Sequence, residues 1–154
     1  MRIDPSSTSS RTFLWAPAAT LVEQAASRRR LRLLWVPLLL WGYLQYRFVG
    51  DRRVKQAGGP RGMSQGFPER LVTDGIYART RNPMYLGHMI YLTGLALVTR
   101  SPVAVGYLAH AIPWFDARAE ADEARLEAHF GADYVAYRGS VPRWIPRASL
   151  GRQK

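Results

Sequence analysis

The sequence predicts an all-α fold, an integral-membrane helical bundle, on three observations. The 154-residue chain holds three apolar runs of 14, 16 and 14 residues, at residues 33–46, 84–99 and 102–115. Tryptophan and tyrosine stand at the ends of these runs, as they do in the interfacial belts of membrane proteins. The second and third runs are apolar on every face, whereas a surface helix of a soluble protein carries a polar stripe.

Composition excludes several classes of protein. With 47% hydrophobic and 12% aromatic residues, the chain is too apolar for a disordered basic tail. It has no cysteine, which excludes a disulfide scaffold, a cysteine nucleophile and a zinc–thiolate site. The net charge of +11 is spread along the flanks of the apolar runs instead of forming one stripe. This distribution fits anionic lipid headgroups, and no nucleic-acid partner is expected.

The N-terminal segment is the weakest part of the predicted bundle. Residues 1–11 are predicted to be disordered, and residues 12–26 to form a short helix in or on the membrane that Pro17 interrupts. The segment is not a signal peptide by its charge pattern, because the basic residues 28–30 follow the apolar part instead of preceding it.

The length of the apolar runs leaves two interpretations open. As a helix each run is about 21–24 Å long, whereas a bilayer core is about 30 Å thick. A buried helix of a soluble protein is therefore the alternative to a membrane span. The aromatic run ends and the flanking arginines, which can snorkel toward headgroups, favour the membrane.

Arg100, Ser101 and Pro102 separate the second and third runs and predict the tight turn of a transmembrane helical hairpin. Proline suits the first position of the second helix, because no backbone N–H is needed there. Both ends of the hairpin then lie on one side of the membrane.

Charge asymmetry predicts which side that is. Residues 51–81 carry seven Lys/Arg against three acids, residues 116–154 carry seven against six, and the hairpin turn carries only Arg100. The positive-inside rule therefore places the central loop and the tail in the cytoplasm. The basic cluster at residues 28–32 conflicts with this if residues 33–46 span once, so the spans before this point and the side of the N-terminus stay open.

Polar residues crowd the entry to the second apolar run, where Pro83 is predicted to begin a helix. They are Tyr77, Arg79, Arg81 and Asn82. A helix start offers unpaired N–H groups and positive partial charge, which suit a carboxylate or a phosphate. The alternative is a helix end that snorkelling arginines anchor, and the residues by themselves leave the two balanced.

Six of the eleven acidic residues fall between Asp116 and Asp133, in a segment with helical spacing of its apolar residues. It is predicted to be a C-terminal, cytoplasmic amphipathic helix. Asp122 and Glu123 are adjacent, so their side chains point about 100° apart and do not face one ligand equally. One interpretation is that this helix presents a carboxylate to a ribose or an amine. The alternative is a solvated helix that leaves the membrane.

The three histidines are interpreted as structural, with His88 and His110 inside apolar helices and His129 at the surface. None has metal-ligand spacing, so no metal site is expected. The chain also lacks the glycine-rich phosphate loops of soluble nucleotide-binding folds.

Two longer motifs occur in a fixed order, GIYARTRNPMYLG at residues 75–87 and DEARLEAHFGADYVAY at residues 122–137. Together they resemble the isoprenylcysteine carboxyl methyltransferase family and the related phospholipid methyltransferases, over residues 31–146. The matching positions are Gly75, Tyr77, Arg81, Pro83, Tyr85 and Gly87, then Glu123, Leu126, Phe130, Gly131, Tyr134 and Tyr137. Asp122 replaces a glutamate of the family, and Asn82 stands where the eukaryotic members have histidine.

The resemblance implies a small integral-membrane enzyme that uses S-adenosylmethionine, and it implies roles for particular residues. The cofactor residues would be Arg81, Asn82, Pro83, Tyr85, Gly87, Glu123 and Leu126. The catalytic residues would be Glu123, Asp122 and Arg143. Tyr134 and Tyr137 would line the substrate entrance. We expect one membrane domain at residues 12–146, with its core at residues 31–146, and a basic tail at residues 147–154.

The implied reaction is methyl transfer to a lipid-like or prenylated acceptor, on a carboxylate oxygen or an amine nitrogen. The expected partners are the bilayer and this lipophilic acceptor, while the oligomeric state is not assigned. Twenty arginines against two lysines are typical of a GC-rich genome, so a bacterial inner membrane is expected, with the cofactor site facing the cytoplasm. The alternatives are a non-enzymatic scaffold of the same family and an NADPH-dependent membrane reductase. The reductase motif R-x-P-N-Y is not matched, because Met84 precedes Tyr85.

Overall fold

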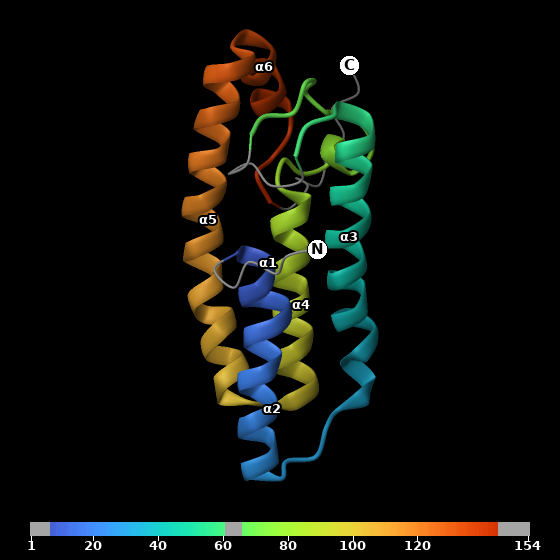
Figure 1. The fold of residues 1–154 in the computed structure, drawn as a ribbon, viewed down its shortest axis with the longest axis vertical. Helices are drawn as coiled ribbons and strands as arrows, with labels where there is room; N and C mark the ends of the chain where they lie inside the picture. The colour runs from blue at the N-terminus through green and yellow to red at the C-terminus, as the bar shows by residue number, and fades with distance from the viewer. Residues whose placement is uncertain (1–6, 61–65, 145–154) are drawn as a thin grey trace, which may run out of the picture. The chain divides into compact units, whose positions relative to one another are not determined.

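The computed structural model describes residues 7–60 and 66–144, and every regular element within them is a helix (Figure 1). This confirms the all-α prediction. No helix of the described ranges is both long and apolar enough to cross a bilayer. In chain order the elements are α1 (Thr8–Ser10), the π-helix η1 (Arg11–Trp15), α2 (Ala16–Ser27), the 3-10 helix η2 (Leu33–Trp35), α3 (Val36–Ala57), the 3-10 helix η4 (Gly75–Ala78), α4 (Pro83–Thr99), α5 (Pro102–Phe130) and α6 (Ala132–Ser140).

The described residues form two compact units, each assembled from segments that are distant in the sequence. Unit 1 comprises residues 7–47 and 84–117, and unit 2 comprises residues 48–60, 66–83 and 118–144. The sequence predicts one domain here. Helices α3 and α5 each continue from one unit into the other. The predicted basic tail, residues 147–154, lies outside the described residues.

Helical structure begins earlier than the sequence predicts. The expectation of disorder for residues 1–11 is wrong for the last four of them, because α1 begins at Thr8 and η1 follows directly. The Ser7 hydroxyl accepts a hydrogen bond from the Ser10 backbone N–H at 3.1 Å, which caps this helix. Ser9 also bonds the Tyr46 hydroxyl at 2.7 Å, a contact that composition does not reveal. Residues 1–6 lie outside the described residues.

The helix predicted over residues 12–26 is present, but Pro17 does not interrupt it. Pro17 lies in the first turn of α2, where a missing backbone N–H costs nothing and the fixed backbone angle suits the helix. The helix ends at Arg28, which adopts the left-handed conformation with a φ of 48°.

The chain turns between two helices at residues 100–102, as predicted, while a transmembrane hairpin at this place stays a prediction. Helix α4 ends at Thr99 and α5 begins at Pro102, while Arg100 takes a φ of 54° (Figure 1). The Ser101 hydroxyl accepts hydrogen bonds from the backbone N–H groups of residues 103 and 104, at 3.2 and 3.3 Å. The rings of Tyr85 and Phe115 lie 5.3 Å apart, so the start of α4 packs against a later part of α5.

The third apolar run and the acidic segment are not separate helices. They form the single helix α5, which continues through Pro113 and ends at Phe130. The sequence signals a change of polarity near residue 116, but polarity alone does not break a helix. Gly131, with a φ of 56°, follows the end of α5, and its N–H donates to the Glu127 carbonyl at 2.8 Å.

Glycines bring α3 and α4 into backbone contact in unit 1. A methyl group added at Gly42 would lie 2.3 Å from the Tyr91 backbone nitrogen, and one at Gly94 would lie 2.6 Å from the Leu39 backbone. Gly87 faces the same seam, 2.9 Å from the Tyr46 nitrogen by the same measure. Only a residue without a side chain permits this approach, which lets dispersion contacts extend along both helices.

We expect Gly42→Ala to lower the free energy of unfolding by about 1–3 kcal/mol, the usual cost of overpacking. Gly106→Ala in α5 is the matched control, because its added methyl meets nothing within 4 Å. Removing that helical glycine should raise stability by about 0.5–1 kcal/mol. Denaturant titration of the detergent-solubilised protein measures both, and equal effects would contradict the close approach of α3 and α4.

Candidate functional site

A buried carboxylate forms the centre of unit 2. Glu123 lies on α5 with 4% of its surface exposed. Its Oε2 accepts a hydrogen bond from Arg81 Nη2 at 3.0 Å, and its Oε1 accepts one from Asn82 Nδ2 at 2.8 Å. Arg143 donates to both oxygens, from Nε at 3.2 Å and from Nη2 at 3.3 Å. The structure therefore brings together four residues that the sequence predicts for the site.

Backbone carbonyls at the end of α6 and directly after it hold Arg81 in place. The Arg81 N–H donates to the Pro142 carbonyl at 3.0 Å, and its Nη1 donates to the carbonyls of Arg138 and Val141 at 2.8 and 3.1 Å. A guanidinium with this many acceptors has little freedom to move. The loop before α4 and the segment after α6 are thus tied together, and this explains how Arg143 reaches Glu123.

Thr80 belongs to the same arrangement, although sequence reasoning missed it. Its side chain is 2% exposed, and its hydroxyl donates to the Arg143 carbonyl at 2.9 Å. This bond joins positions 63 residues apart. A threonine between two arginines carries no local signal of such a contact, so only the folded chain identifies it.

Two polar atoms at this site have no hydrogen-bond partner among the described residues. They are Arg81 Nε and the Tyr134 hydroxyl, and both are buried. Buried polar groups without partners are uncommon, and each one is explained by a ligand, a water or tolerated strain. Two guanidinium groups converge on one carboxylate here, and the buried Arg81 Nε is a donor that suits an anionic ligand group.

Tyr134 and Tyr137 lie in the core of unit 2, with 1% and 7% of their surfaces exposed. They pack with Val141 and with the partly buried Leu126. The Tyr137 hydroxyl donates to the Tyr77 carbonyl at 2.7 Å. Packing accounts for both tyrosines, and their predicted contact with a substrate stays a prediction.

Burial also changes the acidity of these two tyrosines. It raises the pKa of Tyr134 to about 12, and the nearby carboxylate of Glu123 adds to the shift. The pKa of Tyr137 is raised still further, again mainly because burial disfavours the phenolate. Both hydroxyls therefore stay protonated at neutral pH, where they can donate hydrogen bonds.

Asp122, the neighbour of Glu123 on α5, is buried as well. It is 6% exposed, and its Oδ1 lies 3.9 Å from Arg125 Nη1 on the same helix. A catalytic role for Asp122 stays a prediction.

Pro83 is the first residue of α4 and is fully buried.

Tyr85 and Gly87 belong to unit 1, where each has a structural role. Tyr85 packs against Phe115, and the space beside Gly87 is filled by the backbone of α3. Helix packing therefore accounts for this glycine, and a cofactor contact at either residue stays a prediction. His88 is 2% exposed and its ring lies 4.7 Å from that of Phe13, which agrees with a structural role for this histidine.

Comparison with known proteins gives a family match and several relatives. The family model described as phospholipid methyltransferase matches residues 56–132. The protein-S-isoprenylcysteine O-methyltransferase of Schizosaccharomyces pombe is 40% identical over 78 residues, which are 49% of this chain and 33% of that protein. The enzyme of the same name from Homo sapiens is 34% identical over 77 residues, 49% of this chain and 27% of the relative. The chain thus spans about a third of these curated relatives.

A solved structure resembles the whole fold. It is that of the eukaryotic intramembrane Ras methyltransferase, an isoprenylcysteine carboxyl methyltransferase, with a TM-score of 0.58. The match covers 92% of this chain and 54% of that one at 21% sequence identity, so the likeness concerns the fold.

We expect Glu123→Ala to lower the free energy of unfolding by about 3–5 kcal/mol, because it leaves two arginines partly buried without their carboxylate. Glu127→Ala is the matched control on the same helix. Its partner Arg138 is exposed, so its loss should cost at most about 1 kcal/mol. Urea unfolding measures both, and equal costs would show that the buried cluster does not stabilise unit 2.

The two core tyrosines should respond differently to loss of the hydroxyl. At pH 7, Tyr134→Phe should be neutral or slightly stabilising, because its hydroxyl has no partner among the described residues, whereas Tyr137→Phe should cost about 1–2 kcal/mol.

Alkaline pH gives a second measurement on the same variants. The pKa of Tyr134 is raised in the folded state, so its contribution to stability is complete below about pH 10 and is lost as the pH rises toward 12. Tyr134→Phe should therefore lose less stability than the parent between pH 9 and pH 11 in urea titrations. An identical loss in both proteins would contradict the assigned shift.

Proposed function

Because the chain belongs to the phospholipid methyltransferase family, we propose that it is an integral-membrane methyltransferase that uses S-adenosylmethionine. The family match also confirms the resemblance that the two sequence motifs carry. The acceptor in this proposal is lipid-like or prenylated, and the methyl group goes to a carboxylate oxygen or an amine nitrogen.

The buried cluster around Glu123 is the observation that supports this proposal most strongly. Arg81, Asn82 and Glu123 all lie inside the matched range, residues 56–132, and they contact one another directly. Removing one partner of a buried ion-pair cluster is costly, but replacing the whole cluster by apolar packing is often neutral, so stability alone does not explain why a cluster stands here. The presence of such a cluster in a unit of this size fits a role in binding a ligand.

The residues at the cluster fit the chemical groups of the proposed cofactor. When bound, S-adenosylmethionine supplies a methyl group on a positively charged sulfur. Arg81 and Arg143 are the donors suited to a ligand carboxylate, and the unpartnered Arg81 Nε is one such donor. The Glu123 carboxylate, with Asn82, is suited to hydroxyl or ammonium groups.

Little acid–base chemistry is needed for the proposed reaction, because the transferred methyl group is already activated. The chain's contribution is to align the reactants and exclude water. A carboxylate acceptor needs no general base. An amine acceptor must lose a proton, and Glu123 is the carboxylate in the site proposed to accept it, with Asp122 as the neighbouring candidate.

The proposed location is a bacterial inner membrane, with the cofactor site on the cytoplasmic side. Two features support this: the apolar runs with aromatic ends, and the excess of basic residues in the central loop. The solved structural neighbour is described as an intramembrane enzyme. The lipophilic acceptor would then be reached from the bilayer.

Ligand-dependent stability of the detergent-solubilised protein tests the proposal. S-adenosylmethionine and S-adenosylhomocysteine should each raise the apparent stability, by about 2.7 kcal/mol at a hundredfold excess over the dissociation constant. Glu123→Gln should weaken both by about tenfold or more, since a charge-assisted hydrogen bond contributes about 1.5–3 kcal/mol. Glu127→Gln, outside the cluster, should bind as the parent does.

Other outcomes distinguish the alternatives. Stabilisation by NADPH alone would replace the methyltransferase with a reductase, and stabilisation by none of the ligands would favour a scaffold. Methyl transfer is then assayed with a farnesylated cysteine and with phosphatidylethanolamine, which separate an O-methylated carboxylate from an N-methylated amine.

A further inference from the structure

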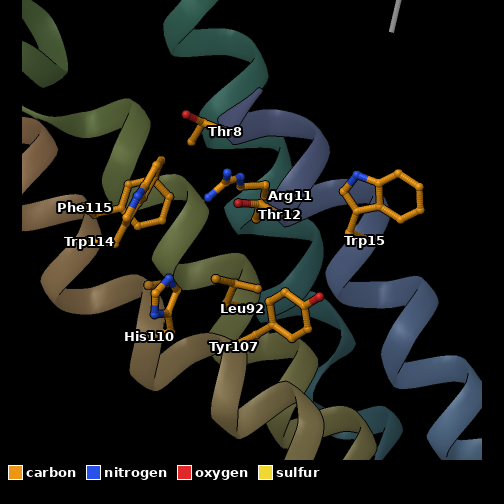
Figure 2. Close-up of a pocket in the computed structure, with 10 residues that line it drawn as sticks. Thr8, Arg11, Thr12, Trp15, Leu92, Tyr107, His110, Trp114 and Phe115 are labelled. Carbon is orange, nitrogen blue, oxygen red and sulfur yellow. The ribbon is translucent and has the colours of Figure 1, made fainter. Parts of the chain in front are cut away.

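Unit 1 contains a pocket that shares no residue with the cluster around Glu123. Its volume is about 310 Å³, at the small end of the roughly 300–1,000 Å³ that ligand sites occupy. Figure 2 shows its walls, which come from α1 and η1 on one side and from α4 and α5 on the other. The lining residues are Thr8, Arg11, Thr12, Trp15, Leu92, Tyr107, His110, Ala111, Trp114 and Phe115.

Arg11 is the one formally charged residue in this lining, and none of the ten is acidic. Its guanidinium carbon lies 5.8 Å from the centre of the Trp114 ring, so the cation is held over an aromatic face. No carboxylate or carbonyl of the described residues bonds this guanidinium. Figure 2 shows it directed toward Trp114 across the pocket. An aromatic pocket that presents a guanidinium and no acidic side chain among its lining residues suits an anion.

The element that carries Arg11 is itself unusual. Arg11–Trp15 is a π-helix, a form that accounts for well under 1% of residues and occurs frequently at functional sites. It contributes Arg11, Thr12 and Trp15 to the pocket. Phe13 of the same turn packs on the other side, with its ring 4.8 Å from those of Tyr46 and Tyr91. This aromatic contact fixes the turn, so the three pocket residues are held in place.

We propose that this pocket binds a small amphiphilic anion, with its carboxylate or phosphate head on Arg11 and an apolar body between Trp15, Tyr107 and Trp114. The hydroxyl of Thr12, a residue 4% exposed, supplies a further hydrogen-bonding group beside the head. The volume admits one ring or a short chain and excludes a whole phospholipid or a prenylated peptide. The site therefore goes beyond the proposed methyl transfer and does not rest on it.

Four probes test the proposal on the full chain in detergent micelles. They are 4-phenylbutyrate, 3-phenylpropyl phosphate, the neutral 4-phenylbutanol and inorganic phosphate. Tryptophan fluorescence reports binding, because Trp15 and Trp114 line the pocket, and protein-free micelles correct for partitioning. We expect at least one anionic amphiphile to bind tenfold or more tightly than the alcohol, and inorganic phosphate not to bind. Whether the carboxylate or the phosphate ester binds more tightly identifies the natural head group.

Substitutions test whether the probes bind in this pocket. Arg11→Gln should weaken the anionic amphiphiles by about tenfold or more and change binding of the alcohol much less, because the positive charge and the guanidinium donors matter only for the anionic head. Arg30→Gln, which removes an exposed arginine outside the pocket, is the matched control and should have no effect. Ala111→Leu, which fills the pocket, should weaken all the amphiphiles, and circular dichroism checks the fold of each variant.

Three results would overturn the proposal: an alcohol that binds as tightly as the anions, an Arg11→Gln protein that binds them as the parent does, or equal losses in Arg11→Gln and Arg30→Gln. Binding of S-adenosylmethionine is measured on the same variants. Its retention in Arg11→Gln would separate this site from the Glu123 cluster, so either proposal can fail without the other.

Discussion

The arrangement of unit 2 depends on one interaction, the enclosure of the Glu123 carboxylate by Arg81, Asn82 and Arg143. A carboxylate removed from water needs hydrogen-bond donors and opposite charge, and here they come from two separate parts of the chain, residues 81–82 and Arg143. To supply them, the loop before α4 and the segment after α6 must both reach α5. Hydrogen bonds from Arg81 and Thr80 to the backbone carbonyls of residues 141–143 make that convergence specific.

A different constraint operates in unit 1, where packing and not charge determines the structure. Gly42 and Gly94 permit backbone contact between α3 and α4, and Phe13 fixes the π-helix η1 through an aromatic cluster. These contacts position Arg11 beside a pocket with aromatic walls. The two units thus use cations in two ways: paired with a buried carboxylate in unit 2, and held over an aromatic ring in unit 1.

Several features of the fold and of the site followed from the sequence because their causes are local. The turn at residues 100–102 depends on residues within a few positions, and the sequence predicted it. The different directions of Asp122 and Glu123 follow from helix geometry alone. The two motifs indicated Glu123, Arg81 and Asn82, and the wider family resemblance added Arg143, since no local rule shows that these residues meet.

The sequence by itself determined the helical fold class, the hairpin turn and the family, because periodicity, turn residues and motif spacing are properties of short segments. Only the tertiary structure decided that α5 is continuous, that Gly87 serves helix packing, that Thr80 joins the site and that Tyr134 and Tyr137 are buried. Apart from the continuity of α5, these features depend on contacts between residues distant in the chain. Such contacts form only when burial and charge pairing are satisfied together, and no local pattern of the sequence encodes that.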